Sequence, residues 1–129
     1  MADLSAAHAL CESAQLADGG DGFRFEVSYF GAPQAAFAVR YLGQAHAYLN
    51  RCAHVPMELD WQPGKFFEGD GRYIICATHG AIYEPDSGIC AAGPCRGAKL
   101  IKLLLTERDG HVYWHVSKLQ VGSISPVFD

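Results

Sequence analysis

The sequence predicts an all-β fold of small antiparallel sheets, arranged as a barrel or a sandwich. Segments such as residues 23–29 and 111–116 alternate apolar and polar side chains, which is typical of half-buried strands. Glycine and proline recur between such segments and predict short turns, and no long stretch has a helical period. With 129 residues, 50% of them hydrophobic and 19% charged, the chain fits a single domain spanning residues 1–129.

The expected elements follow from these patterns in chain order. We expect strands at residues 9–11, 23–29, 35–41, 45–49, 72–75, 99–106 and 111–116, a helical turn at 13–16, and turns at 42–44 and 107–110. The Gly31-Ala32-Pro33 sequence is expected to separate the second and third strands. Residues 51–71 and 84–98 are rich in glycine and proline and predict two long loops. His8 is expected in a terminal tail.

Composition restricts the classes of partner and the compartment. A net charge of −4 and a pI near 5.8 argue against binding nucleic acid or anionic membrane surfaces. The chain lacks the run of about 18 apolar residues that a transmembrane helix needs, and its first residues do not resemble a signal peptide. We therefore expect a soluble, cytoplasmic protein. In a reducing compartment, its five cysteines would more often be metal ligands or free thiols than disulfides.

Two short motifs each place a cysteine close to a histidine. The first is Cys52-Ala53-His54 and the second is Cys76-Ala77-Thr78-His79, and both lie in expected loops at strand ends. Two thiolates and two imidazoles could close a tetrahedral zinc site, or they could hold a two-iron cluster with the cysteines on one iron and the histidines on the other. Structural zinc sites usually pair cysteine with cysteine, so the mixed pairs favour a binuclear centre.

With its flanking residues, this arrangement resembles the Rieske [2Fe–2S] proteins. The family pattern is Cys-x-His in one loop and Cys-x-x-His-Gly in a second loop about twenty residues later, followed by a Gly-Pro loop that covers the cluster. The resemblance extends from about Ala9 to Val116. The residues that carry it are Cys52, His54, Cys76, His79, Gly80, Ala81, Ile82, Tyr83, Asp86, Ser87, Gly88, Gly93 and Pro94.

The resemblance implies a Rieske-like fold whose cluster-binding part spans about residues 50–98, with one [2Fe–2S] cluster per chain. It implies that Cys52 and Cys76 bind the inner iron and that His54 and His79 bind the outer iron. Gly80 would let backbone N–H groups approach the cluster sulfurs. The other residues that the resemblance places around the cluster are Tyr83, Gly93 and Pro94.

Within the family, the chain is similar to the soluble Rieske ferredoxins. The membrane-complex branch carries an extra cysteine in each loop and a serine after His-Gly, where this chain has Met57, Thr78 and Ala81. The resemblance therefore implies a lower reduction potential and a one-electron carrier between a reductase and an oxygenase or similar redox enzyme. A catalytic domain is not expected, although the chain could be one component of an oxidoreductase. The alternatives are a zinc-bound interaction module and a small regulatory subunit with the same fold.

Several other residues could have special roles, but plainer ones are favoured. Cys90 and Cys95 could form a disulfide, and we expect them instead to be small, partly buried thiols; Cys11 is expected in the core. Extra ligand roles are considered for three histidines, for which a solvated strand face is the favoured explanation: His46, His111 and His115. Three aromatic residues are expected to pack the first loop against the domain rather than form a docking surface: Trp61, Phe66 and Phe67.

Overall fold

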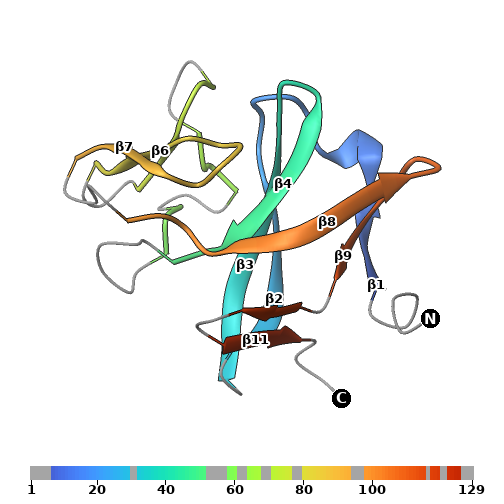
Figure 1. Ribbon diagram of the computed structural model, residues 1–129. Coiled ribbons are helices and arrows are strands. Elements are labelled where there is room, and N and C mark those ends of the chain that lie inside the picture. Colours follow the sequence, from blue (N-terminus) through green and yellow to red (C-terminus); the bar gives the residue numbers. More distant parts are fainter. Residues whose placement is uncertain are drawn as a thin grey trace.

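The structure of the chain, a computed structural model, describes residues 7–29, 32–51, 58–60, 64–67, 71–76, 80–93, 98–115, 117–119 and 122–125. Almost all regular structure in these residues is β, and the predicted all-β fold class is confirmed (Figure 1). The strands are β1 (Ala7–Glu12), β2 (Phe23–Tyr29), β3 (Ala32–Tyr41), β4 (Gln44–Leu49), β5 (Ile74–Ile75), β6 (Ile82–Tyr83), β7 (Cys90–Ala92), β8 (Lys102–Arg108), β9 (His111–His115), β10 (Ser117–Leu119) and β11 (Gly122–Ser125). One 3-10 turn, η1 (Ser13–Gln15), follows β1.

The strands form a large sheet and a small sheet, both antiparallel. The large sheet has the order β1-β9-β8-β4-β3-β2-β11-β10, and the small sheet has the order β5-β6-β7. In Figure 1 the small sheet lies on one side of β4, and β9 and β1 lie on the other. No helix in the described part of the chain is long and apolar enough to cross a membrane.

Strands β3 and β4 contribute to two apolar clusters because successive side chains of a strand point to opposite faces. The first cluster lies between the large sheet and the small one, and the second fills the space among β1, β2, β8 and β9. The first cluster consists of Phe37, Val39, Tyr48, Leu59, Phe66, Ile74, Cys76, Ala81, Tyr83 and Leu100. The second consists of Leu16, Val27, Tyr29, Ala36, Ala38, Ala47, Leu49, Leu103, Val112 and Trp114. The predicted Cys76 ligand therefore belongs to the cluster that joins the two sheets.

Several predicted boundaries are wrong, and the reasons are physical. β3 begins at Ala32 and includes Pro33, which pairs with Ser28 of β2. The pairing of β3 with β4 begins only at Ala36, so Pro33 removes no hydrogen bond from that side. Gly31 lies outside the described residues.

Four short strands were not predicted from the sequence. The segments expected to be loops or left unassigned contain β6, β7, β10 and β11, and β11 pairs with β2 at Tyr29. Strands of two to four residues carry too short an alternation to stand out. The expected strand at 99–106 is shifted to 102–108. His8 belongs to β1, and its ring contacts that of Trp114 in a tilted arrangement with centroids 4.9 Å apart, so its placement in a tail is wrong.

The loop aromatics pack against the domain, as predicted for Phe66 and Phe67. Phe66 is fully buried and stacks on Phe37 with ring centroids 3.9 Å apart. Phe67 is half-buried and stacks on Tyr41. Trp61 lies outside the described residues.

Arg40 joins distant parts of the large sheet. Its Nε donates to the carbonyl of Leu16 at 2.8 Å, and its terminal nitrogens donate to the carbonyls of Ser13 (3.2 Å) and Gly43 (3.1 Å). The same nitrogens bind both carboxylate oxygens of Glu107 at 2.6 and 3.1 Å. The two-point ion pair thus connects β3 with β8 beside η1.

Replacing Glu107 by glutamine is expected to remove part of the acid sensitivity of the fold. The hydrogen bond from Arg40 lowers the pKa of Glu107 below its ordinary value of 4.5. The unfolded chain therefore binds this proton at a higher pH than the folded chain does. The stabilisation is complete above pH 4.5 and is lost as the pH falls through the lower, folded pKa. We expect Glu107→Gln to lose about 0.5–1 kcal/mol at neutral pH and almost nothing at strongly acid pH.

Urea unfolding as a function of pH measures this difference. Glu26→Gln, at an exposed position of β2, is the matched control for replacing a carboxylate that Arg40 does not bind. Parallel profiles for the wild type and Glu107→Gln would contradict the prediction.

Candidate metal centre

The second predicted ligand loop is closed by a tight backbone turn. Cys76 follows β5, and its N–H donates to the carbonyl of Ala81 at 2.8 Å. The N–H of Gly80 donates back to the carbonyl of Cys76 at 2.8 Å. Gly80 has a φ of +73°, a conformation that glycine adopts without the cost of a Cβ. The predicted ligand His79 lies outside the described residues, between these two hydrogen-bonded ends.

Cys76 lies in an apolar environment at the base of this loop. Its residue is fully buried, within the first apolar cluster, together with Ala81 and Tyr83. The surroundings and hydrogen bonding of cluster sulfurs set the potential of iron–sulfur sites, and burial is part of this control. A buried thiol at the start of a glycine-terminated turn is a donor that fits a [2Fe–2S] cluster. The N–H of Gly80 itself is engaged by Cys76, so the groups expected to approach the cluster sulfurs would be other N–H groups.

The structure describes the residues on either side of the first predicted ligand loop. Cys52 and His54 lie outside the described residues, whereas Asn50 precedes them and Leu59 follows them. Leu59 is fully buried and belongs to the same apolar cluster as Cys76. The end of the first loop is therefore packed in the same cluster as the base of the second.

The third loop begins in close contact with the second. Gly93 has a φ of +96°, and a Cβ built there would lie 3.0 Å from the Cα of Ala81 and 3.2 Å from the carbonyl oxygen of Gly80. Only glycine allows the two backbones to approach this closely. This contact fits the expectation that the Gly-Pro loop covers the site, although Pro94 lies outside the described residues.

Cys90 differs from the sequence prediction. It begins β7, opposite Tyr83 of β6, and it is disulfide-bonded. The expectation of a plain thiol is therefore wrong for Cys90; its partner is not among the described residues, and Cys95 also lies outside them. The prediction relied on the rarity of disulfides in reducing compartments. That rule takes no account of how close two cysteine side chains lie in the folded chain. Cys11 is half-buried, packs against the second apolar cluster and takes part in no disulfide, as expected of a core residue.

The other predicted residues have different environments. Tyr83, expected near the cluster, is fully buried on β6. His111 is exposed, as a solvated face requires, whereas His115 is half-buried with its Nε2 2.8 Å from the hydroxyl oxygen of Thr106. His46 is only 9% exposed, and burial, with the charge of Lys102, lowers its pKa. The solvated-face explanation is therefore wrong for His46.

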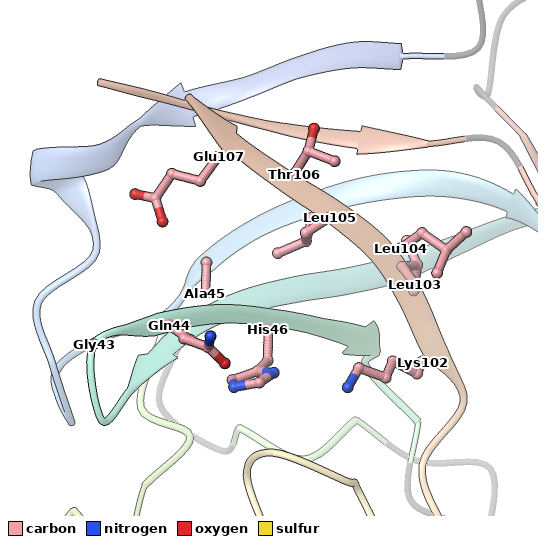
Figure 2. Close-up of a pocket in the computed structure, with 10 residues that line it drawn as sticks. All are labelled: Gly43, Gln44, Ala45, His46, Lys102, Leu103, Leu104, Leu105, Thr106 and Glu107. Carbon is pink, nitrogen blue, oxygen red and sulfur yellow. The ribbon is translucent and has the colours of Figure 1, made fainter. Parts of the chain in front are cut away.

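An open pocket in the large sheet is lined by described residues other than Cys76, the one predicted ligand that the structure describes. It forms where the pairing of β4 with β8 ends, beyond the Ala47–Leu103 pair. Figure 2 shows its lining, with the ammonium group of Lys102 extending from β8 toward the ring of His46 on β4. The lining residues are Gly43, Gln44, Ala45, His46, Lys102, Leu103, Leu104, Leu105, Thr106 and Glu107, none of which is a predicted ligand.

Sequence reasoning missed the polar residues that hold the first loop. Asn50 is 1% exposed and Asp60 is 6% exposed, and the amide of Asn50 donates to the carboxylate of Asp60 at 2.8 Å. Residue type alone does not indicate that these two side chains are buried, because a polar residue in a loop segment is usually solvated. Their positions on either side of the Cys-x-His motif were the one available signal.

Comparisons with known proteins identify the family and the fold. Residues 6–113 match the model of the Rieske [2Fe-2S] domain. Curated protein sequences give no match. The fold is similar to the ferredoxin of carbazole 1,9a-dioxygenase from Nocardioides aromaticivorans IC177, with a TM-score of 0.67 and 20% identity over 85% of this chain and 97% of that chain.

Two further solved structures share the fold. A chain in the complex of reduced oxygenase and oxidized ferredoxin of carbazole 1,9a-dioxygenase has a TM-score of 0.64 and 23% identity, over 84% of this chain and 92% of that chain. The terminal oxygenase of carbazole 1,9a-dioxygenase from N. aromaticivorans IC177 has a TM-score of 0.65 and 19% identity, over 88% of this chain but 31% of that chain. The family match covers the loops that carry both Cys/His motifs and most of the strands around them. The chain belongs to the Rieske [2Fe–2S] domain family.

Proposed function

We propose that this chain is a one-electron carrier that holds one Rieske [2Fe–2S] cluster and passes electrons from a reductase to an oxygenase or a similar redox enzyme. The observation that carries the proposal is the family match over residues 6–113. The fold is also similar to a dioxygenase ferredoxin over 97% of that chain, which supports the role of an electron carrier.

In this proposal, Cys52 and Cys76 hold the inner iron and His54 and His79 hold the outer iron. The bound cluster would supply one-electron oxidation and reduction. The burial of Cys76 supports the assignment. The cysteine-bound side of the cluster would face the protein interior, and the histidine-bound side would lie nearer to a partner protein. The close contact of Gly93 with Ala81 supports a role for Gly93 and Pro94 in covering the loop, with Gly80 and Tyr83 beside it.

The proposal includes a single domain over residues 1–129, with the cluster-binding part at about 50–98. The first apolar cluster, shared by the large and small sheets, supports it.

The proposal also places the protein in the cytoplasm. Its similarity to the soluble, lower-potential Rieske ferredoxins supports this location. The disulfide at Cys90 counts against a reducing compartment. Labelling the free thiols of the protein inside intact cells, and counting the labelled cysteines, would decide between a reducing and an oxidising compartment.

Electron paramagnetic resonance of the dithionite-reduced protein tests the function, with iron, sulfide and zinc assayed on the same sample. We expect two irons and two sulfides per chain and a Rieske-type signal, because two imidazoles on one iron give that iron a distinct environment. Stoichiometric zinc without this signal, together with failed anaerobic reconstitution, would overturn the proposal in favour of a structural zinc module.

A further inference from the structure

A buried carboxylate lies directly after the first predicted ligand loop. The side chain of Asp60 is fully buried, and its Oδ1 accepts a hydrogen bond from Asn50 Nδ2 at 2.8 Å. Its Oδ2 accepts the backbone N–H of Gly64 at 2.9 Å and lies 3.2 Å from Nε of Arg24. A buried charge is costly unless it is paired and hydrogen-bonded, and both oxygens of Asp60 are engaged.

Asn50 completes this network from the other end of the loop. Its Oδ1 accepts the N–H of Leu59 at 2.7 Å, and its backbone N–H donates to the carbonyl of Ala35 on β3 at 2.8 Å. One side chain thus binds the chain just before Asp60 through Leu59 and also binds Asp60 itself. Asn50 is anchored to the large sheet, so the network fixes the exit of the loop to its entrance.

The geometry assigns a positioning role to these two side chains, which we call the Asn50–Asp60 clamp. The clamp joins Asn50 to Leu59 and Asp60, and in the sequence both predicted ligands, Cys52 and His54, lie between these joined positions. It rests on the proposed function, because it takes these two residues as cluster ligands. Groups that orient ligands from behind typically change metal affinity by about 10- to 100-fold when they are removed.

Asp60→Asn should release the cluster faster while keeping the size of the side chain. The new amide group must place its NH₂ toward either the Asn50 amide or the Gly64 N–H, so one hydrogen bond of the clamp becomes a contact between two donors. We expect chelator-induced bleaching of the cluster to be about 10- to 100-fold faster than in the wild type. Asn50→Ala, which removes both side-chain bonds of Asn50, should show the same change and serves if Asp60→Asn does not fold.

Two control variants separate positioning from general stability. Val27→Ala removes buried apolar volume from the second cluster, on the far side of the sheet from the ligand loops, so it should lower the free energy of unfolding without speeding bleaching more than about threefold. Glu58→Gln changes the exposed partner of Arg24 at 2.8 Å and leaves the clamp intact, so its bleaching rate should match that of the wild type.

A double variant tests the clamp by exchange. Asn50→Asp with Asp60→Asn swaps the two side chains: the carboxylate at position 50 can accept from Leu59 N–H and from the amide at position 60, whose carbonyl can accept from Gly64. We expect bleaching to return to within a few-fold of the wild-type rate, with the wild-type resonance line shape restored. Fast bleaching in both single variants without recovery in the double variant would contradict the exchange and with it the clamp.

The outcomes distinguish the clamp from the function on which it rests. Bleaching of Asp60→Asn and Asn50→Ala no faster than that of Val27→Ala, in a wild type that shows the Rieske signal, would overturn the clamp alone. A wild type that assembles no [2Fe–2S] cluster after anaerobic reconstitution would overturn the function, and with it the clamp. Fast bleaching in both single variants and recovery in the double variant would establish it.

Discussion

Replacement of Cys76 by alanine is expected to abolish the [2Fe–2S] cluster while the fold is kept. The two hydrogen bonds that close the second loop, from Cys76 N–H to Ala81 and from Gly80 N–H to Cys76, use backbone atoms and survive the substitution. In the proposed function, the Cys76 thiolate is a ligand of the inner iron, and the methyl group of alanine cannot bind iron. We expect iron and sulfide contents near zero, no Rieske resonance, and a loss of unfolding free energy of about 1–2 kcal/mol from the buried sulfur.

Cys11→Ala is the matched control for this experiment. Cys11 is half-buried on β1, packs against the second apolar cluster, and burial raises the pKa of its thiol. It should lose a comparable part of the stability and retain full iron, sulfide and the resonance signal. A Cys76→Ala protein that still carries two irons, two sulfides and the Rieske signal would remove Cys76 from the ligand set.

Replacement of Gly88 by alanine is expected to destabilise the protein by about 2–4 kcal/mol, through backbone strain and overpacking together. Gly88 is buried with a φ of +77°, and a Cβ built there would lie 2.8 Å from Cε1 of Tyr48 and 3.4 Å from Leu100. Tyr48 has little room to move, because it is fully buried and its hydroxyl donates to the carbonyl of Pro85 at 2.7 Å. The turn that carries Gly88 would have to shift away from β4.

Gly110→Ala separates the two contributions. Gly110 has nearly the same backbone conformation, with a φ of +78°, but no heavy atom lies within 4 Å of its built Cβ. It should lose only the strain of a left-handed alanine, about 1 kcal/mol. Urea unfolding of both variants measures the difference, and equal losses would show that the contact with Tyr48 is not limiting.

The sequence predicted the longer elements well where alternation extends over enough residues. The strand at 23–29 has the predicted bounds, and Phe25, Val27 and Tyr29 point inward as its pattern requires. The β3 segment is buried on both faces from Ala36 to Val39, which alternation cannot anticipate because it assumes one solvated face. The small sheet escaped prediction because two or three residues do not define a period.

At the candidate site, the sequence by itself predicted the donor set, and its resemblance to the Rieske proteins predicted the family, which the match over residues 6–113 confirms. The ability of thiols and imidazoles to bind metal can be inferred from residue type and spacing. On that basis the sequence predicted four ligands: Cys52, His54, Cys76 and His79. Only the tertiary structure decided that Asp60 is buried and bound to Asn50, that Gly93 contacts the second loop, and that Cys90 is disulfide-bonded. The spacing of residues in the sequence shows only which chemical groups lie close together along the chain. The burial and pairing of a polar side chain depend on partners brought from other strands, and those partners exist only once the chain has folded.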